Sequence, residues 1–233
     1  MKEQNYKNKY FSIMGDSIST LAGCNPPDYN VFYEGDKQVM SGVYSPCDTW
    51  WGQVIEGLGG KLLVNNAFSG SLVCRHPACQ IQSYGCSDER TSMLGKDGQA
   101  PDVVMVYLGT NDWGGGLGIR PCTEDDPLSV FSEAYCAMLE KIRRNYPQAE
   151  IWCFTLAVSV NRHQNDWHFP YSISGWHIEV YCDLIRTCAE KVGCRVIDLY
   201  KNAKPYDTID GFHPSAEGMR TISEAVLEQL QKE

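Results

Sequence analysis

The sequence predicts an α/β protein with a parallel sheet and helices on both faces of that sheet. Short apolar runs alternate five times along the chain with longer segments that carry apolar residues at helical spacing. One run, Asp102 to Leu108, is almost continuously apolar, as expected for a central strand that is covered on both faces. Parallel strands of this kind are joined by right-handed crossovers. No repeat, linker or low-complexity tract divides the 233 residues, so we expect a single domain over 1–233.

The first part of the chain predicts two strands and one helix. A strand over 9–14 ends at a Gly-Asp-Ser turn. The connection 18–47 is too long for an ordinary βα loop, and its aromatic residues favour an ordered rim over a site. Asp48 is predicted to cap a helix that ends before Gly59-Gly60, and a second strand follows over 61–67.

The middle of the chain predicts two further strands. Residues 72–100 are irregular apart from one short helix near 88–94, and the strand over 102–108 follows. Three consecutive glycines after Trp113 predict a flexible loop. Asp126-Pro127 is typical of a helix start, with proline at the first helical position, and this helix is expected to run to about Asn145. A strand over 150–156 follows it.

The last part of the chain predicts the fifth strand between two helices. A second long connection, 157–174, precedes a helix over 175–192, and the strand covers 195–199. Ser215 is predicted to cap the final helix. We therefore expect a three-layer α/β/α sandwich in which the five parallel strands take the flavodoxin-like order 2-1-3-4-5.

Composition and charge exclude several classes of protein. The formal net charge is −9, and no basic stripe is present, which argues against nucleic acid as a partner. No apolar run approaches the roughly 18–20 residues of a membrane span. The polar, lysine-rich start of the chain does not resemble a signal peptide. A cytoplasmic protein is expected, or a secreted one if a leader has been removed.

The chain has eleven cysteines, and several of them lie in apolar patterns. Cys136, Cys153 and Cys188 are predicted to be small buried residues in a reducing compartment. The group Cys74, Cys79, Cys86 and His76 lacks the paired Cys-x-x-Cys spacing of common structural zinc sites. A metal or a local disulfide there is the minor alternative, and we expect neither a metal nor another cofactor.

Four polar blocks follow predicted strands and should meet at one edge of the sheet, where open α/β folds bind ligands. Ser17 follows the first strand, Gly70 the second, Asn111 the third, and the block Asp210 to His213 the fifth. A serine hydroxyl becomes a nucleophile when a neighbouring base takes its proton. His213 is the natural base, and Asp210 can orient it from within the same turn.

Attack on an ester carbonyl creates an oxyanion that needs hydrogen-bond donors already in place. The sequence offers the backbone N–H groups of Ser17 and Gly70 and the side-chain amide of Asn111. Glycine allows close approach of the backbone, and an asparagine amide donates without a change of protonation. Each of these residues is also an ordinary turn former, so no single block is decisive.

At these blocks the chain resembles the SGNH hydrolases, the GDSL-type esterase/lipase superfamily. The matching residues are Gly15-Asp16-Ser17, Asn66-Ala67-Phe68-Ser69-Gly70, Gly109-Thr110-Asn111-Asp112 and Asp210-Gly211-Phe212-His213-Pro214. The resemblance implies metal-free ester hydrolysis through an acyl-enzyme. It implies Ser17 as nucleophile, His213 as base, Asp210 as orienting acid, and Gly70 and Asn111 as oxyanion donors with Ser17. Ile18 and Ser71 depart from residues common in the family, but neither touches the proposed chemistry.

The sequence defines the substrate less closely than it defines the candidate catalytic residues. Aromatic residues on the long segments, Tyr33, Trp113, Trp167 and Phe169, are predicted to line the substrate pocket, with a place in the core as the equal alternative. Aromatic side chains at the site favour a short acyl group, in the first place acetyl, on a carbohydrate or another small polar substrate. A lysophospholipase or thioesterase with longer acyl chains, a non-catalytic glycan-binding module on the same fold, and acyl transfer to an alcohol remain as alternatives. The sequence is silent on oligomeric state.

Overall fold

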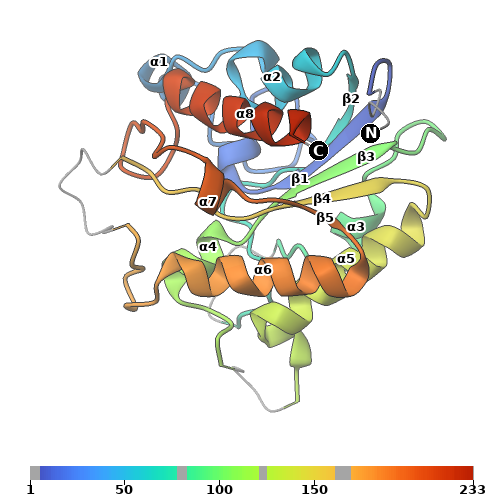
Figure 1. The fold of residues 1–233 in the computed structure, drawn as a ribbon, viewed down its shortest axis with the longest axis vertical. Helices are drawn as coiled ribbons and strands as arrows, with labels where there is room; N and C mark the ends of the chain where they lie inside the picture. Colours follow the sequence, from blue (N-terminus) through green and yellow to red (C-terminus); the bar gives the residue numbers. More distant parts are fainter. Residues whose placement is uncertain (1–5, 78–82, 121–124, 161–168, 233) are drawn as a thin grey trace.

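The computed structural model describes residues 6–77, 83–120, 125–160 and 169–232. It contains a five-stranded sheet in the order β2-β1-β3-β4-β5, and every neighbouring pair is parallel. The strands are β1 (Tyr10–Gly15), β2 (Lys61–Asn65), β3 (Val103–Tyr107), β4 (Glu150–Phe154) and β5 (Arg195–Ile197). Helices cover both faces of the sheet (Figure 1), so the predicted α/β fold class and strand order are confirmed.

The helices form two layers with the sheet between them (Figure 1). One layer consists of α1 (Asp36–Ser41), α2 (Trp50–Gly57) and α8 (Ala216–Gln231). The other consists of α3 (Asp88–Ser92), α4 (Thr110–Gly115), α5 (Phe131–Asn145) and α6 (Ile178–Val192). A short helix, α7 (Leu199–Asn202), directly follows β5, and 3₁₀ turns cover Ser17–Ser19, Pro46–Asp48 and Pro127–Ser129.

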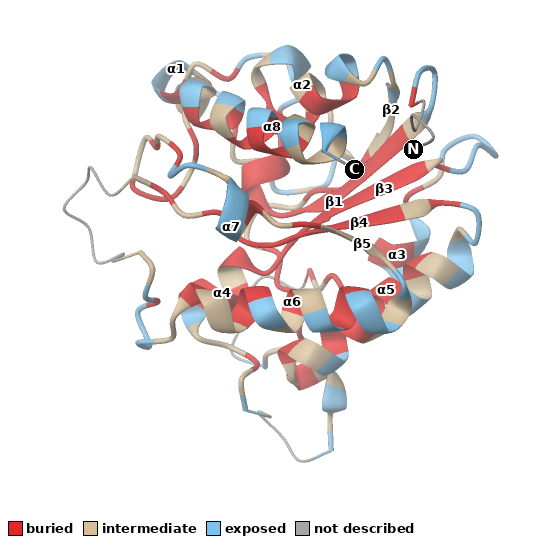
Figure 2. Cartoon of the chain, viewed as in Figure 1, coloured by how far each residue is buried: buried red, intermediate tan, exposed pale blue. Residues whose placement is uncertain are grey.

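The core lies between the sheet and the two helical layers (Figure 2). Every residue of β3 is buried, as the apolar run predicted for a central strand. Helix α5 turns one apolar stripe toward the sheet and leaves its charged residues outside. Cys136, Cys153 and Cys188 are buried, which confirms their predicted place in the interior.

Two helix starts differ from the sequence prediction. Thr49 rather than Asp48 caps α2, because its hydroxyl accepts a hydrogen bond from the backbone N–H of Gly52 at 3.0 Å. The Asp48 carboxylate instead accepts the backbone N–H of Ser45 at 2.9 Å and ends the preceding 3₁₀ turn. Helix α5 begins at Phe131, after a separate turn that Asp126 caps.

The first part of the segment predicted as a flexible loop after β3, Trp113 to Gly115, belongs to the helix α4. Trp113 is fully buried, and its indole N–H donates to the carbonyl of Trp176 at 3.0 Å. Asp112 is also buried, and its carboxylate accepts the backbone N–H groups of Val73 and Cys74. These tertiary contacts outweigh the low helix propensity of the glycines that follow.

Candidate active site

Ser17 stands directly after β1, in the first turn beyond the end of the strand. Asp16 caps the 3₁₀ turn Ser17–Ser19 by accepting the backbone N–H of Ile18 at 3.1 Å. A side chain at Gly15 would put a Cβ 2.7 Å from the Cβ of Ser19, so glycine is needed there for the tight exit from the strand. Ser17 is 3% exposed, and its hydroxyl faces the last block rather than bulk water.

His213 joins Ser17 to Asp210 in one hydrogen-bonded chain. Its Nε2 lies 3.0 Å from Ser17 Oγ, and its Nδ1 lies 2.7 Å from Asp210 Oδ2. The other oxygen of Asp210 accepts the backbone N–H groups of Phe212 and His213 at 3.0 and 2.7 Å. With Nδ1–H donating to the carboxylate, the Nε2 lone pair is directed at the Ser17 hydroxyl. The arrangement can therefore remove the proton of the serine.

The carboxylate of Asp210 is ionised throughout the neutral pH range. Partial burial acts to raise its pKa, but hydrogen bonds and the charge of His213 outweigh this and lower the pKa to about 2. Two backbone donors also fix the carboxylate in place. Asp210 can thus hold the tautomer of His213 and stabilise the ring when it gains a proton.

Phe32, which the sequence analysis did not single out, lies against the imidazole of His213. The two rings are stacked with centroids 3.5 Å apart and an interplanar angle of 12°. Phe212 contacts the same imidazole edge-on at 5.2 Å. Phe32 belongs to the long segment after β1, so part of this segment packs on the block Asp210 to His213. No pattern in the sequence distinguishes Phe32 from its neighbour Tyr33.

The predicted oxyanion donors come from three segments at the same edge of the sheet. The Asn111 side-chain amide donates to the carbonyl of Ser71 at 2.9 Å, which places it against the Gly70 segment and leaves its second N–H for another acceptor. Gly70 has a φ of +83°, a conformation that favours glycine. Within the described ranges, neither the Ser17 N–H nor the Gly70 N–H has a hydrogen-bond acceptor.

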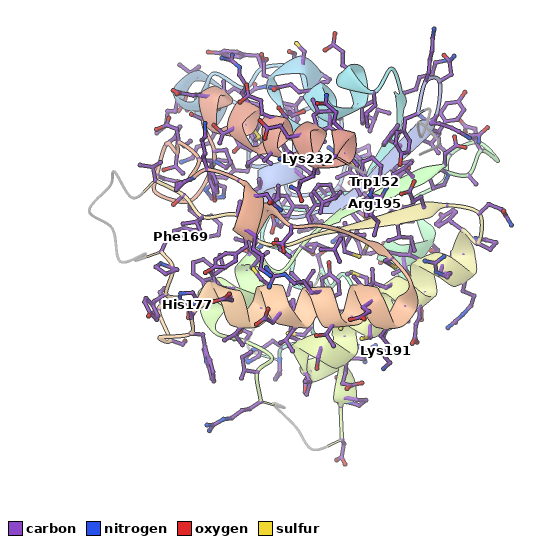
Figure 3. The ribbon with its side chains drawn as sticks, viewed as in Figure 1. Trp152, Phe169, His177, Lys191, Arg195 and Lys232 are labelled. Carbon is purple, nitrogen blue, oxygen red and sulfur yellow. The ribbon has the colours of Figure 1, made fainter. Side chains whose placement is uncertain are left out.

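Two of the four aromatic residues predicted to line the pocket are core residues. Trp113 and Tyr33 are both 0% exposed, and Tyr33 donates its hydroxyl to the carbonyl of Pro214 at 2.8 Å. Their polar atoms are satisfied inside the protein, so in this structure they support the site and do not line it. Phe169 is partly exposed where the strands end (Figure 3), 4.7 Å from Trp113 and 6.2 Å from Phe212 between ring centroids. Trp167 lies outside the described residues.

The cysteine group considered for a metal is only partly described. Cys74 and Cys86 are buried, and the thiol of Cys74 donates to Asp112 at 3.0 Å, while Cys79 lies outside the described residues. Among the residues that are described, no three His, Cys, Asp or Glu side chains are grouped so that they could hold a metal ion. His177 accepts the backbone N–H of Glu179 at 3.2 Å and caps α6, and His163 and His168 are not described.

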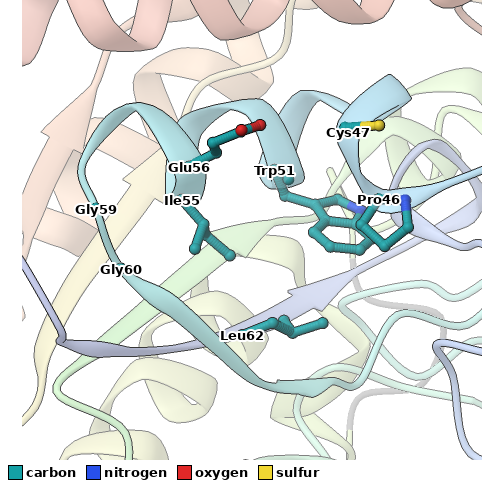
Figure 4. Close-up of a pocket in the computed structure, with 9 residues that line it drawn as sticks. Pro46, Cys47, Trp51, Ile55, Glu56, Gly59, Gly60 and Leu62 are labelled. Carbon is teal, nitrogen blue, oxygen red and sulfur yellow. The ribbon is translucent and has the colours of Figure 1, made fainter.

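A separate pocket of about 450 Å³ lies between α2 and β2 (Figure 4). Trp51 and Ile55 of α2 and Leu62 of β2 line its apolar wall. None of its lining residues belongs to the four polar blocks, so it is distinct from the candidate active site. In the parts of the chain that the structure describes, no helix has the length and apolar character that crossing a bilayer requires.

The chain is similar to known ester hydrolases in sequence and in fold. The family model of GDSL-like lipase/acylhydrolase matches residues 9–168, a range that includes Ser17, Gly70 and Asn111. No curated protein matches the chain in sequence. A candidate GDSL-like lipase from Bacteroides ovatus superposes with a TM-score of 0.72 and is 25% identical, covering 97% of this chain and 100% of its own.

Two further solved structures share the fold at low identity. The aryl esterase of M. smegmatis has a TM-score of 0.64 and 16% identity, with 96% of this chain and 99% of its own covered. A family 2 carbohydrate esterase with a carbohydrate binding domain, from Corynascus thermopiles, has a TM-score of 0.60 and 16% identity, with 96% of this chain and 66% of its own covered. The family match spans most of the sheet and three of the four blocks, so the chain belongs to the GDSL-like lipase/acylhydrolase family of ester hydrolases.

Proposed function

We propose that this protein is a serine esterase that hydrolyses a carboxylic ester through an acyl-enzyme. The observation that carries the proposal is the hydrogen-bonded chain from Ser17 through His213 to Asp210, with contacts of 3.0 and 2.7 Å. A serine, a histidine and a carboxylate in this geometry have the roles of nucleophile, base and orienting group. A glycan-binding module would not require the three in contact, which argues against the non-catalytic alternative.

The first half of the reaction transfers the acyl group to the protein. His213 Nε2 takes the proton of Ser17 while Oγ attacks the ester carbonyl, and the carbonyl oxygen becomes an oxyanion. The N–H groups of Ser17 and Gly70 and the amide of Asn111 are the proposed donors to this oxygen. When the intermediate collapses, the imidazolium gives its proton to the leaving alcohol, and the acyl group stays on Ser17.

The second half releases the acid. His213 takes a proton from water, the resulting hydroxide attacks the acyl carbonyl, and the same donors stabilise the second oxyanion. Collapse of this intermediate breaks the bond to Ser17 Oγ, which regains its proton from His213. Replacement of water by an alcohol acceptor would give acyl transfer with the same residues.

The proposed substrate is a short acyl ester, in the first place an acetyl ester, of a carbohydrate or another small polar alcohol. Support comes from two partly exposed aromatic residues near the triad, Phe32 against His213 and Phe169 against Phe212, because aromatic side chains suit contact with a sugar ring. The fold shared with the family 2 carbohydrate esterase is consistent with this substrate class. The burial of Trp113 and Tyr33 reduces the aromatic surface on which the sequence-based argument rested.

One observation favours the alternative of longer acyl chains. Val39 and Met40 of α1 and the nearby Tyr44 are 70%, 56% and 57% exposed. Helix α1 is close to the site, since Lys37 lies over the ring of Phe32 at 5.3 Å. Exposed apolar side chains beside a catalytic centre suit a lipid or acyl-chain substrate.

Hydrolysis of p-nitrophenyl esters from acetate to decanoate tests both the mechanism and the acyl preference. We expect activity that falls beyond butyrate, and loss of at least about 1,000-fold in kcat for Ser17→Ala. The matched control is Ser19→Ala, in the same 3₁₀ turn, which loses only the contact with the indole of Trp50 and should keep its kcat. An active Ser17→Ala protein would refute the mechanism, and activity that rises with chain length would transfer the proposal to a lysophospholipase or thioesterase.

A further inference from the structure

Arg90, in α3, is a buried cation close to the catalytic edge of the sheet. Its side chain is in the interior, and the residue is 3% exposed. Burial lowers the pKa of Arg90 to about 10, so it remains charged at neutral pH. Among the described residues, no carboxylate lies within ion-pair distance of its guanidinium. A buried charge of this kind is costly unless other groups satisfy it.

The guanidinium is satisfied entirely by uncharged acceptors. Arginine has five N–H donors, and Arg90 makes five hydrogen bonds. Nε donates to the side-chain oxygen of Asn66. Nη2 donates to the backbone carbonyl of Asn66 and to the carbonyl of Gly15, the latter at 3.2 Å. Nη1 bonds the hydroxyl of Ser71 at 2.8 Å and the hydroxyl of Ser83.

These acceptors belong to the segments that carry the proposed oxyanion donors. Gly15 precedes Ser17 by two residues, and Asn66 and Ser71 lie on either side of Gly70 in the chain. The carbonyl of Ser71 accepts the amide of Asn111, so the third donor is tied to the same network. Arg90 therefore bonds two of these segments directly and is linked to Asn111 through Ser71.

We infer that Arg90 is a positioning residue for the oxyanion donors of this esterase. Its rigid, planar fork fixes the spacing between the end of β1 and the Gly70 segment, which a lysine could not do with one nitrogen. Donors stabilise a developing charge only when they are held in place before the reaction. The inference rests on the proposed function and adds a residue to its machinery.

The test compares Arg90→Lys and Arg90→Met with Arg75→Met as a matched control. Arg75 is an exposed arginine on the segment that follows the Gly70 block. Its Nη1 lies 3.8 Å from Asp126 Oδ2. We measure kcat and KM with the best p-nitrophenyl ester, and the inhibition constant of a phenylboronic acid, whose tetrahedral adduct with Ser17 mimics the intermediate. Far-UV circular dichroism and the thermal midpoint report folding separately.

For both Arg90 variants we expect kcat to fall by roughly 100-fold with KM within about three-fold of wild type. The inhibition constant of the boronic acid should rise in parallel with the loss of kcat, and Arg75→Met should resemble wild type. A folded Arg90→Lys protein with wild-type kcat and boronic acid affinity would overturn the inference. A lowered thermal midpoint with unchanged kcat would assign Arg90 a purely structural role and would overturn it equally.

Ser83→Ala keeps the test decisive if the Arg90 variants do not fold. The substitution removes one acceptor of Arg90, which lies outside the segments that carry the proposed oxyanion donors. It leaves the charge of Arg90 in place. We expect kcat to fall by about three- to ten-fold at unchanged KM. Wild-type kcat and boronic acid affinity in Ser83→Ala would overturn the inference. Wild-type protein that hydrolyses no ester would instead refute the proposed function, and the inference with it.

Discussion

Two carboxyl groups near Ser17, those of Asp210 and Asp16, have opposite pKa shifts because their surroundings differ. The pKa of Asp210 is lowered to about 2, because its contacts with His213 outweigh its partial burial. Asp16 is fully buried between Ser17 and the strand, and this burial raises its pKa from 3.8 to about 7. The charge of Arg90 and the hydrogen bond from Ile18 reduce this shift without removing it.

Asp16 should make the folded protein less stable as pH rises from about 4 to 7. In that window the folded state keeps a proton that the unfolded state has released, so the free energy of unfolding declines with pH. Asp16→Asn keeps the acceptor for Ile18 and removes the titration. We expect urea unfolding at pH 4, 5, 6, 7 and 8 to show the variant gaining stability relative to wild type toward pH 7.

The control for this pH series is Asp36→Asn, on the exposed surface of α1, which should follow the wild-type curve. Parallel curves for wild type and Asp16→Asn between pH 4 and 7 would contradict the prediction. Asp210 acts in the opposite sense: its lowered pKa contributes stability above about pH 4 that is lost as the pH falls toward 2. The two effects occupy different pH ranges and can be separated.

At the scale of elements, helix α8 connects the block Asp210 to His213 to the helical layer that also contains α1 and α2. It begins at Ala216, three residues after His213, and Ser215 caps it by accepting the backbone N–H of Gly218 at 3.2 Å. Ser215 also donates to Asp207 at 2.7 Å. Gly218 packs so closely on the carbonyl of Asp207 that an added Cβ would lie 2.1 Å from it. The cap and this close approach together fix the start of the helix.

Ser215→Ala should lower the free energy of unfolding by about 1 kcal/mol, the usual cost of losing an N-cap side chain. Urea unfolding at neutral pH measures this change. Thr221→Ala is the matched control, because Thr221 is in the same helix and its hydroxyl only bonds the carbonyl of Glu217 one turn earlier. Equal losses for the two variants would show that the cap does not stabilise α8.

At the scale of the whole molecule, we expect one cooperative unit over 1–233. The apolar core is continuous across both helical layers. Buried tryptophans report on different parts of it, since Trp50 and Trp51 lie in α2, Trp113 in α4 and Trp152 in β4. Tryptophan fluorescence and far-UV circular dichroism should therefore give coincident urea transitions. Separate midpoints would divide the chain into two folding units.

The sequence by itself determined the order of the five strands, the longer helices between them and the four polar blocks. Apolar runs and cap residues are local signals, and parallel connectivity brings the ends of strands to one edge whatever the side-chain details. Ser17, Asp210 and His213 could be predicted for this reason, and the structure places them in hydrogen-bond contact.

Only the tertiary structure decided which side chains support the site. Phe32 and Tyr33 are adjacent aromatic residues, yet one stacks on His213 and the other is buried with its hydroxyl on Pro214. Arg90 lies in a segment without clear periodicity, and its acceptors are Ser83 nearby in the chain and the more distant Gly15, Asn66 and Ser71. Such roles depend on packing between remote segments, which leaves no periodic pattern in the sequence to reveal it.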